Sequence, residues 1–188
     1  DDRNRPMLKF YYNLAPNPTK VALFLEESDL RYEPIAVDTR RGEQHTPAFR
    51  AINPNGKVPV IVDEQGPGGG PFSVFESGAI LLYLANKTGR LLPTEPAARS
   101  IVEQWLMVQI ASVGPMFGQC SHFQRFAPPG NDYGRERYTS EVRRLFKVLE
   151  QRLAAEGMKF VRFTATPGSD DDAVQTIAIA RQRSAQFV

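Results

Sequence analysis

Short apolar and β-branched stretches alternate with stretches of helical periodicity through the first ninety residues. The strands are predicted over residues 7–12, 32–37, 57–63 and 72–75. Helices are predicted over 18–29 and 77–88, with Gly89 ending the latter, and a short helix begins at Thr46-Pro47. A βαβ unit followed by a β-hairpin and a helix is the thioredoxin-like arrangement. We therefore expect an α/β thioredoxin-like domain over residues 1–92.

The pattern becomes entirely helical after a Pro-rich linker at 92–96. Residues 97–126 and 133–155 are predicted as long helices, the first interrupted at Gly114-Pro115. An all-α domain over 97–188 is therefore expected. Its last part, 158–188, carries only a short, weakly apolar helix candidate capped near Ser169.

Composition narrows the classes of function. The chain has 41% hydrophobic and 23% charged residues and a formal charge of only +2, without a basic stripe interleaved with aromatic side chains. We therefore expect no nucleic-acid partner.

No apolar run is long enough to cross a membrane, and the start lacks a signal-peptide core. The single Cys120 excludes a disulfide within the chain, which suits the cytoplasm. His45 has no second ligand at metal spacing, so no metal site is expected.

The first candidate for chemistry is Lys57-Val58-Pro59. A proline in a β-rich run lacks the N–H that a ladder needs, so it marks either an edge strand with a trans bond or a cis bond. A cis bond would turn the Val58 backbone outward, where its N–H and C=O can pair with an extended peptide. Taken alone, this segment favours the trans edge strand, because cis bonds are the minority.

The second candidate is Glu76-Ser77, at the junction between a predicted strand and a predicted helix. Free N–H groups at the helix start, with the Ser77 hydroxyl, attract a carboxylate, and Glu76 can hold an ammonium group. Taken alone, the pair is better explained as an ordinary helix cap. Together, the two segments provide a pairing edge, a carboxylate pocket and an ammonium pocket. That combination fits a small zwitterionic peptide such as glutathione.

Separate motifs along the chain then point to a family. They are A-P-N-P-T-K-V at 15–21, N-P-N-G-K-V-P-V-I-V-D at 53–63, S-V-F-E-S-G-A-I-L-L-Y-L at 73–84, G-P-M-F-G-Q at 114–119 and R-E-R-Y at 135–138. Residues 7 to about 153 resemble the cytosolic glutathione transferase superfamily. The motifs are most similar to the bacterial nu class of glutathione-dependent disulfide-bond oxidoreductases and to the related yeast nitrogen-regulation prion protein.

The resemblance assigns roles to individual residues. It implies that Glu76 and Ser77 bind the γ-glutamyl end of glutathione and that Val58, within Lys57-Val58-Pro59, pairs with its cysteinyl backbone. It implies that Gln44 contacts the glycyl end. In a homodimer, Arg137 would reach the ligand of the partner subunit.

The glutathione thiol needs a donor that favours its thiolate form. In this class the donors precede the first helix, commonly a threonine and an asparagine one residue apart. Asn17 matches the asparagine and is the expected catalytic residue. Ala15 stands at the threonine position, a departure from the family, and Asn13 or the backbone of the helix start is a possible substitute.

The resemblance implies a glutathione-dependent enzyme that reduces small disulfides or conjugates electrophiles, with glutathione as cosubstrate and no metal. The alternative is a non-catalytic glutathione-binding or regulatory protein of the same fold. Residues 158–188 depart from the family, whose members continue with further apolar helices. We therefore expect a truncated or divergent C-terminal part of the glutathione transferase architecture.

Overall fold

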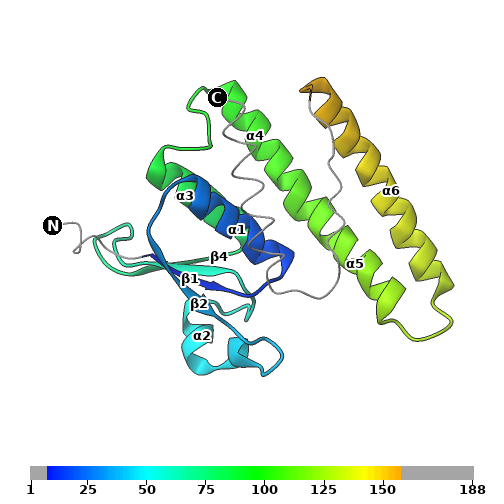
Figure 1. The fold of residues 1–188 in the computed structure, drawn as a ribbon, viewed down its shortest axis with the longest axis horizontal. Coiled ribbons are helices and arrows are strands. Elements are labelled where there is room, and N and C mark those ends of the chain that lie inside the picture. The colour runs from blue at the N-terminus through cyan, green and yellow to red at the C-terminus, as the bar shows by residue number, and fades with distance from the viewer. Residues whose placement is uncertain (1–7, 158–188) are drawn as a thin grey trace. The chain divides into compact units, whose positions relative to one another are not determined.

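The computed structural model describes residues 8–157, which divide into two compact units, residues 8–93 and residues 94–157 (Figure 1). The sequence predictions for residues 1–7 and 158–188, including the helix capped near Ser169, lie outside the described residues.

The first unit is built on a four-stranded sheet with the order β2-β1-β3-β4. Its strands are β1 (Leu8–Tyr12), β2 (Tyr32–Ala36), β3 (Val60–Asp63) and β4 (Phe72–Phe75). β1 pairs in parallel with β2 and antiparallel with β3, and β3 pairs antiparallel with β4. Helix α1 (Pro16–Glu27) connects the parallel pair. This arrangement confirms the predicted thioredoxin-like fold.

Helices cover both faces of this sheet. Helices α1 and α3 (Ser77–Thr88) lie on one face, and α2 (Pro47–Ile52) lies on the other with the short 3₁₀ turn η2 (Glu43–His45) (Figure 1). Successive residues of a strand point to opposite faces. Ile61 accordingly packs in the α1–α3 cluster and Val60 in the α2 cluster, and both are fully buried. The central strand β3 is therefore held from both sides.

Two elements of this unit begin at other residues than predicted. The strand predicted from residue 57 begins only at Val60, since Pro59 has no N–H to donate to a ladder. The helix predicted from residue 18 begins at Pro16, because the first helical turn tolerates prolines. By contrast, Thr46 caps α2 through a 3.3 Å bond from Phe49 N, and Gly89 ends α3 at φ +66°, as predicted.

The second unit is helical. It contains α4 (Pro96–Val108), the π-helical segment η3 (Gln109–Val113), α5 (Gly114–Arg125) and α6 (Asp132–Ala155). The predicted interruption is confirmed, because the π-helical turn immediately precedes Gly114-Pro115. Pro115 lacks the N–H that would continue a regular ladder, and such a break bends or widens a helix.

Close packing joins α5 to α6. A Cβ added at Gly134 would meet Phe123 Cε1 at 2.4 Å, so only glycine fits there without a shift of that ring. Phe117 and Phe146 pack with ring centroids 5.0 Å apart, and Leu145 of α6 is 2% exposed. None of the helices described over residues 8–157 is sufficiently long and apolar to span a bilayer.

Candidate functional site

The Val58-Pro59 peptide bond is cis, which decides between the two alternatives left open by the sequence. The carbonyl of Lys57 accepts a 2.7 Å bond from the buried Asn53 side chain, which holds this segment in place. Between the described residues, no hydrogen bond involves the Val58 backbone, and the β3 ladder begins only at Val60. The Val58 N–H and C=O are thus available to an extended ligand.

Glu76 immediately precedes α3 with φ +69° and ψ 119°, a backbone conformation that costs a non-glycine residue energy. Its side chain does not cap the helix, and the first turn contains no acidic residue. The ordinary capping explanation for Glu76-Ser77 is therefore wrong. Ser77 is 5% exposed at the first helical position. The backbone N–H groups at the start of α3 have no intrahelical acceptor, so they suit an anion.

Two residues beside Glu76 were missed by the sequence reasoning. Asn55 Nδ2 donates to Glu76 Oε1 at 3.1 Å, although the N-P-N-G motif indicated only a turn. Lys20 of α1 lies close enough for the Glu76 charge to act on it. Burial lowers the pKa of the Lys20 ammonium, and Glu76 partly offsets that shift. The Glu76 carboxylate therefore accepts a hydrogen bond from the Asn55 amide and lies within electrostatic range of the Lys20 ammonium.

The start of α1 offers donors from Asn17 alone. Helices begin with N–H groups that lack intrahelical partners, but Pro16 and Pro18 have none to offer. Thr19 N bonds to the carbonyl of the N-cap residue Ala15 at 3.2 Å. Asn17 is exposed, and its backbone N–H and side-chain amide are the remaining donors of this turn. The helix start is therefore suited to one compact anion at Asn17.

Asn13 was named as a substitute for the hydroxyl that Ala15 lacks, but its side chain already makes hydrogen bonds within the protein. Its Nδ2 donates to Thr39 Oγ1 at 3.2 Å, and its Oδ1 accepts from Ala15 N at 3.0 Å. Asn13 therefore orders the loop between β1 and α1.

Gln44 lies in η2, against the turn that precedes Lys57. Gly56 adopts φ +63°, and a Cβ there would lie 3.2 Å from the Gln44 carbonyl, so this approach requires glycine. Gln44 Nε2 donates to Thr39 O at 3.2 Å. Among the described residues, Gln44 Oε1 is the one buried side-chain N or O atom without a hydrogen-bond partner. An unpaired buried polar atom of this kind indicates that a partner is missing.

The turn at residues 55–56 connects three of the predicted positions of the first unit, which are Gln44, the Lys57-Val58 edge and Glu76. The Gly56 turn contacts Gln44 on one side and leads into Lys57-Val58, while Asn55 connects it to Glu76. Arg137 lies on α6 in the second unit, with its side chain 56% exposed and its Nη1 4.0 Å from Glu141 Oε2.

Other candidate chemistry is sparse in the part of the chain that the structure describes. No group of three His, Cys, Asp or Glu side chains within residues 8–157 is placed to hold a metal ion. The half-buried thiol of Cys120 lies 3.8 Å from Thr139 Oγ1, between α5 and α6.

Comparison with known proteins shows which family this sequence matches. The family described as "Glutathione S-transferase, N-terminal domain" matches residues 6–86. The "Disulfide-bond oxidoreductase YfcG" of Escherichia coli is 49% identical over 148 residues, which cover 78% of this chain and 69% of that protein. The "Transcriptional regulator URE2" of Saccharomyces cerevisiae is 40% identical over 151 residues, covering 77% and 42%.

Solved structures of glutathione transferases are also similar to this chain. A Burkholderia graminis glutathione transferase with two glutathione molecules bound per subunit is 47% identical with a TM-score of 0.76, covering 79% of this chain and 62% of that one. A Pseudomonas putida glutathione transferase with one glutathione disulfide bound per subunit is 36% identical with a TM-score of 0.77, covering 96% and 81%. This chain therefore spans between about two fifths and four fifths of the lengths of these four relatives.

Proposed function

Because this chain belongs to the glutathione transferase superfamily, we propose that it binds glutathione and uses the glutathione thiolate to reduce small disulfides. One observation carries the proposal. The Val58 backbone has no hydrogen bond to the described residues, and Asn55, in the turn just before it, bonds to Glu76 at the Glu76-Ser77 junction. The names of the bacterial relatives support the same chemistry, since one is a disulfide-bond oxidoreductase and two are transferases with glutathione or glutathione disulfide bound.

In the proposed complex the γ-glutamyl ammonium group binds Glu76, and its carboxylate accepts from Ser77 and the N–H groups that open α3. The cysteinyl N–H and C=O pair with Val58 as an added strand. Lys57 precedes this edge, and Pro59 ends it before β3. Gln44 contacts the glycyl end, where its unpaired Oε1 suits a donor such as the glycyl N–H.

Asn17 would then stabilise the thiolate. A free thiol with a pKa of about 8.5 is mostly protonated at neutral pH, and a hydrogen bond to the sulfur anion lowers that pKa. Asn17 lies in the first turn of α1, at the positive end of the helix, which adds a further favourable field. This arrangement compensates for Ala15, which lacks the hydroxyl that the family commonly provides.

The reduction proceeds in two exchanges. The glutathione thiolate attacks one sulfur of the disulfide, forms a mixed disulfide and releases the other sulfur as a thiolate, which takes up a proton. The thiolate of a second glutathione then attacks the glutathionyl sulfur of the mixed disulfide, forms glutathione disulfide and releases the second substrate thiol. Two glutathione molecules are oxidised for each disulfide reduced. Two glutathione molecules bound per subunit in the Burkholderia graminis structure are compatible with this stoichiometry.

We further propose that the site is completed in a homodimer, with Arg137 reaching the ligand of the partner subunit. The exposed side chain of Arg137 supports this role. Heterodimers of Arg137→Ala and Glu76→Gln subunits provide the test. If Arg137 acts across the dimer, each heterodimer keeps one intact site and about half of the wild-type turnover. If it acts within its own subunit, neither site of the heterodimer is intact and this recovery is absent. If Arg137 has no role, the Arg137→Ala homodimer itself keeps the wild-type turnover, which separates this case from the first.

Titration calorimetry with glutathione tests binding. Glu76→Gln and Ser77→Ala should each weaken binding, by roughly 10- to 100-fold for Glu76, because a charged hydrogen bond contributes about 1.5–3 kcal/mol. Glu150→Gln, on the exposed side of α6, is the matched control. Binding that is unaffected by both site variants would exclude this half-site.

Paired activity assays test the reaction. Glutathione-dependent reduction of hydroxyethyl disulfide should exceed conjugation of a chloronitrobenzene. The reverse ranking would assign the chain as an electrophile-conjugating transferase. The second candidate is a non-catalytic binder, favoured by the substitution of alanine at position 15. Tight binding without either turnover would support that alternative.

A further inference from the structure

Thr39 makes hydrogen bonds toward two parts of the proposed site. It is half-buried in the loop between β2 and η2. Its hydroxyl oxygen accepts from Asn13 Nδ2 at 3.2 Å, and its backbone carbonyl accepts from Gln44 Nε2, also at 3.2 Å. Asn13 lies in the loop before α1, whereas Gln44 lies in η2. Thr39 therefore connects the loop that precedes α1 to the turn that carries Gln44.

The hydroxyl of Thr39 sets the orientation of the Asn13 amide. With Nδ2 bonded to Thr39, Oδ1 of Asn13 accepts from Ala15 N at 3.0 Å. Ala15 is the N-cap of α1, and its methyl group cannot cap the helix. Pro16 stands between Ala15 and Asn17, and its ring fixes φ, so a rotation of the Ala15 backbone also moves Asn17. The position of Asn17 therefore depends on a chain of bonds that begins at Thr39.

The carbonyl of Thr39 acts separately on Gln44. It accepts from Gln44 Nε2, which leaves Oε1, the buried oxygen without a partner, as the free acceptor of that amide. This carbonyl belongs to the main chain, so it stays when the side chain of Thr39 is changed. A substitution at Thr39 can therefore remove the bond to Asn13 and keep the bond to Gln44.

Other hydrogen bonds hold the loop around Thr39. The Asp38 carboxylate accepts from Arg40 N at 2.9 Å and from Arg41 N at 3.2 Å. Glu43 Oε2 accepts from Asp38 N at 2.6 Å. None of these three bonds uses the Thr39 side chain. Removal of its hydroxyl should therefore leave the loop in place and release Asn13 alone.

We propose that Thr39 is a positioning residue for the glutathione thiolate. Its hydroxyl orients Asn13, Asn13 holds the backbone of Ala15, and this backbone places Asn17 beside the sulfur. The link to the thiolate rests on the proposed function, whereas the ordering of the helix start needs no ligand. A hydroxyl from a distant loop thus fixes the helix start in a chain whose N-cap is alanine.

Amide hydrogen exchange in the free, full-length chain tests the first step without glutathione. Thr39→Val removes the hydroxyl and should speed exchange of the Ala15 N–H roughly five- to tenfold, the effect of one hydrogen bond. Thr39→Ser keeps the hydroxyl and should restore the wild-type rate. If the Val variant exchanges at the wild-type rate, or the Ser variant as fast as the Val variant, the proposal is overturned whether or not the chain binds glutathione.

The bound thiol tests the second step. Thr39→Val should raise the pKa of the glutathione thiol and lower the thiolate fraction at neutral pH roughly threefold, because Asn17 is less well placed. The turnover number should fall by the same factor with little change in KM, and Thr39→Ser should restore both quantities. An unchanged thiol pKa in the Val variant would refute the link to the thiolate. Absence of glutathione binding in the unaltered chain would refute the proposed function instead, and the exchange result would still decide the role of Thr39.

A double-mutant cycle tests whether Thr39 acts through Asn13. Asn13→Ala should speed exchange of the Ala15 N–H and raise the thiol pKa at least as much as Thr39→Val does. Because both residues belong to one chain of bonds, the double variant should be no worse than Asn13→Ala alone. Additive effects of the two substitutions would mean that Thr39 acts by another route and would reject the proposal.

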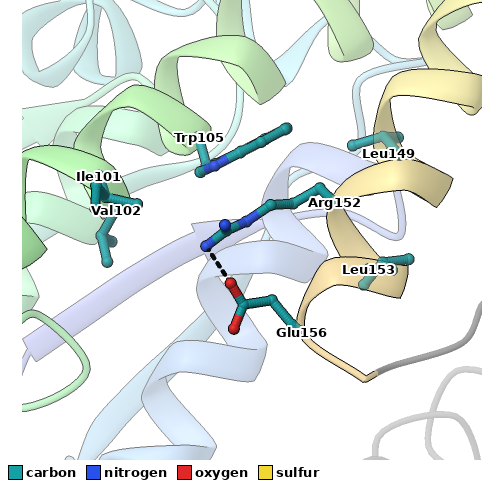
Figure 2. A pocket seen from close by; sticks show the side chains of 7 residues that line it. All are labelled: Ile101, Val102, Trp105, Leu149, Arg152, Leu153 and Glu156. Atoms are coloured by element: carbon teal, nitrogen blue, oxygen red, sulfur yellow. Dashed lines mark ion pairs between the residues drawn. The ribbon is translucent and has the colours of Figure 1, made fainter.

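The helical unit provides the control for folding. Trp105 is the only tryptophan of the chain and lines a pocket of about 510 Å³ between α4 and α6. Figure 2 shows the Arg152 guanidinium beside its ring, 5.4 Å from the ring centre. Trp105 emission should be the same in all variants, because Thr39 belongs to the first unit. If Thr39→Val shifts it, Thr39→Ala takes its place with the same expectations, and a shift in both would overturn a role confined to the start of α1.

Discussion

The side-chain amide of Asn55 donates a 3.1 Å hydrogen bond to Oε1 of Glu76, 21 residues further along the chain. Asn55 lies in the turn before the cis Val58-Pro59 bond, and Glu76 immediately precedes α3. This bond therefore couples the proposed strand-pairing edge to the proposed ammonium site. Removal of Asn55 should consequently affect binding even though Asn55 has no assigned ligand contact.

Asn55→Ala should weaken glutathione binding by roughly 2- to 10-fold, because a single hydrogen bond contributes about 0.5–1.5 kcal/mol. Asn55→Asp should weaken it further, since two carboxylates would then face each other. Calorimetry with the folded variants measures both effects, and Gln151→Ala on exposed α6 is the control. Equal affinities for the Ala and Asp variants would refute the coupling.

Asn17→Ala should raise the pKa of the bound glutathione thiol by about one unit, because one charge-assisted hydrogen bond is worth about 1.4 kcal/mol in this equilibrium. Turnover below that pKa should fall roughly tenfold, since less thiolate is present. The ultraviolet absorbance of the thiolate, followed against pH, measures the shift. Asn17→Asp should raise the pKa more than Ala does. An unchanged thiol pKa in both variants would remove Asn17 from the mechanism.

Gln44 should discriminate between glutathione and γ-glutamylcysteine, which lacks the glycyl residue. Gln44→Ala should weaken binding of glutathione by roughly 2- to 10-fold, the range for one hydrogen bond, and leave γ-glutamylcysteine unaffected. Ser77→Ala, at the opposite end of the ligand, should weaken both alike. If Gln44→Ala weakens both ligands equally, Gln44 acts on the fold of the loop instead of on the glycyl end.

Asp63 should make the first unit sensitive to acid. It is 3% exposed and accepts from Tyr83 Oη and Lys87 Nζ at 2.6 Å each. Burial alone would raise the pKa of Asp63, but these hydrogen bonds outweigh it and leave that pKa below its usual value. The folded state therefore binds the Asp63 proton less readily than the unfolded state. The resulting stability is present above about pH 4 and is lost as the pH falls through the lowered pKa.

Lys87→Met should lower the free energy of unfolding by about 1–3 kcal/mol at neutral pH, since it leaves a buried carboxylate with one partner fewer. That difference should shrink on acidification, as measured by urea unfolding. Lys147→Met, on the exposed face of α6, should have little effect at either pH. A loss from Lys87→Met that is equal in neutral and acidic solution would show that the packing of Lys87, and not its charge, matters.

Two helical glycines should respond in opposite directions to alanine. Gly134→Ala should destabilise the helical unit by about 1–3 kcal/mol, because its Cβ would meet the Phe123 ring, which is stacked on Tyr138. Gly118→Ala on α5 has open space around its Cβ and should stabilise by about 0.5–1 kcal/mol. Thermal unfolding of the two variants provides the comparison. The same sign for both would contradict the close approach of α5 and α6.

Patterns among neighbouring residues were sufficient to predict much of this fold. The spacing of Val21, Phe24 and Leu25 predicts a buried helical face, and all three are buried in α1. Thr46-Pro47 predicts the start of α2, and Gly114-Pro115 the interruption of the long helix. These features depend on side-chain periodicity, missing N–H groups and glycine conformations, which are properties of neighbouring residues.

The candidate site was predicted less completely. The motifs predict Glu76 and Val58 as site residues and glutathione as the class of ligand, and these assignments remain predictions. Asn55 and Lys20 were missed, since a turn motif and one charged position on a helix carry no sign of their partners. The role of Asn13 in ordering its loop was likewise invisible, because its partner Thr39 lies 26 residues away.

The sequence by itself therefore determined the order of strands and helices, the buried faces and the residues that resemble a glutathione site. Only the tertiary structure decided that Glu76 is held at a positive φ beside Asn55 and Lys20, and that Gly56 lets the Gln44 turn approach the Val58 edge. The physical reason is one of range. Periodicity and capping act over a few residues, whereas hydrogen bonds and close contacts between distant segments exist only after the sheet and its helices have packed.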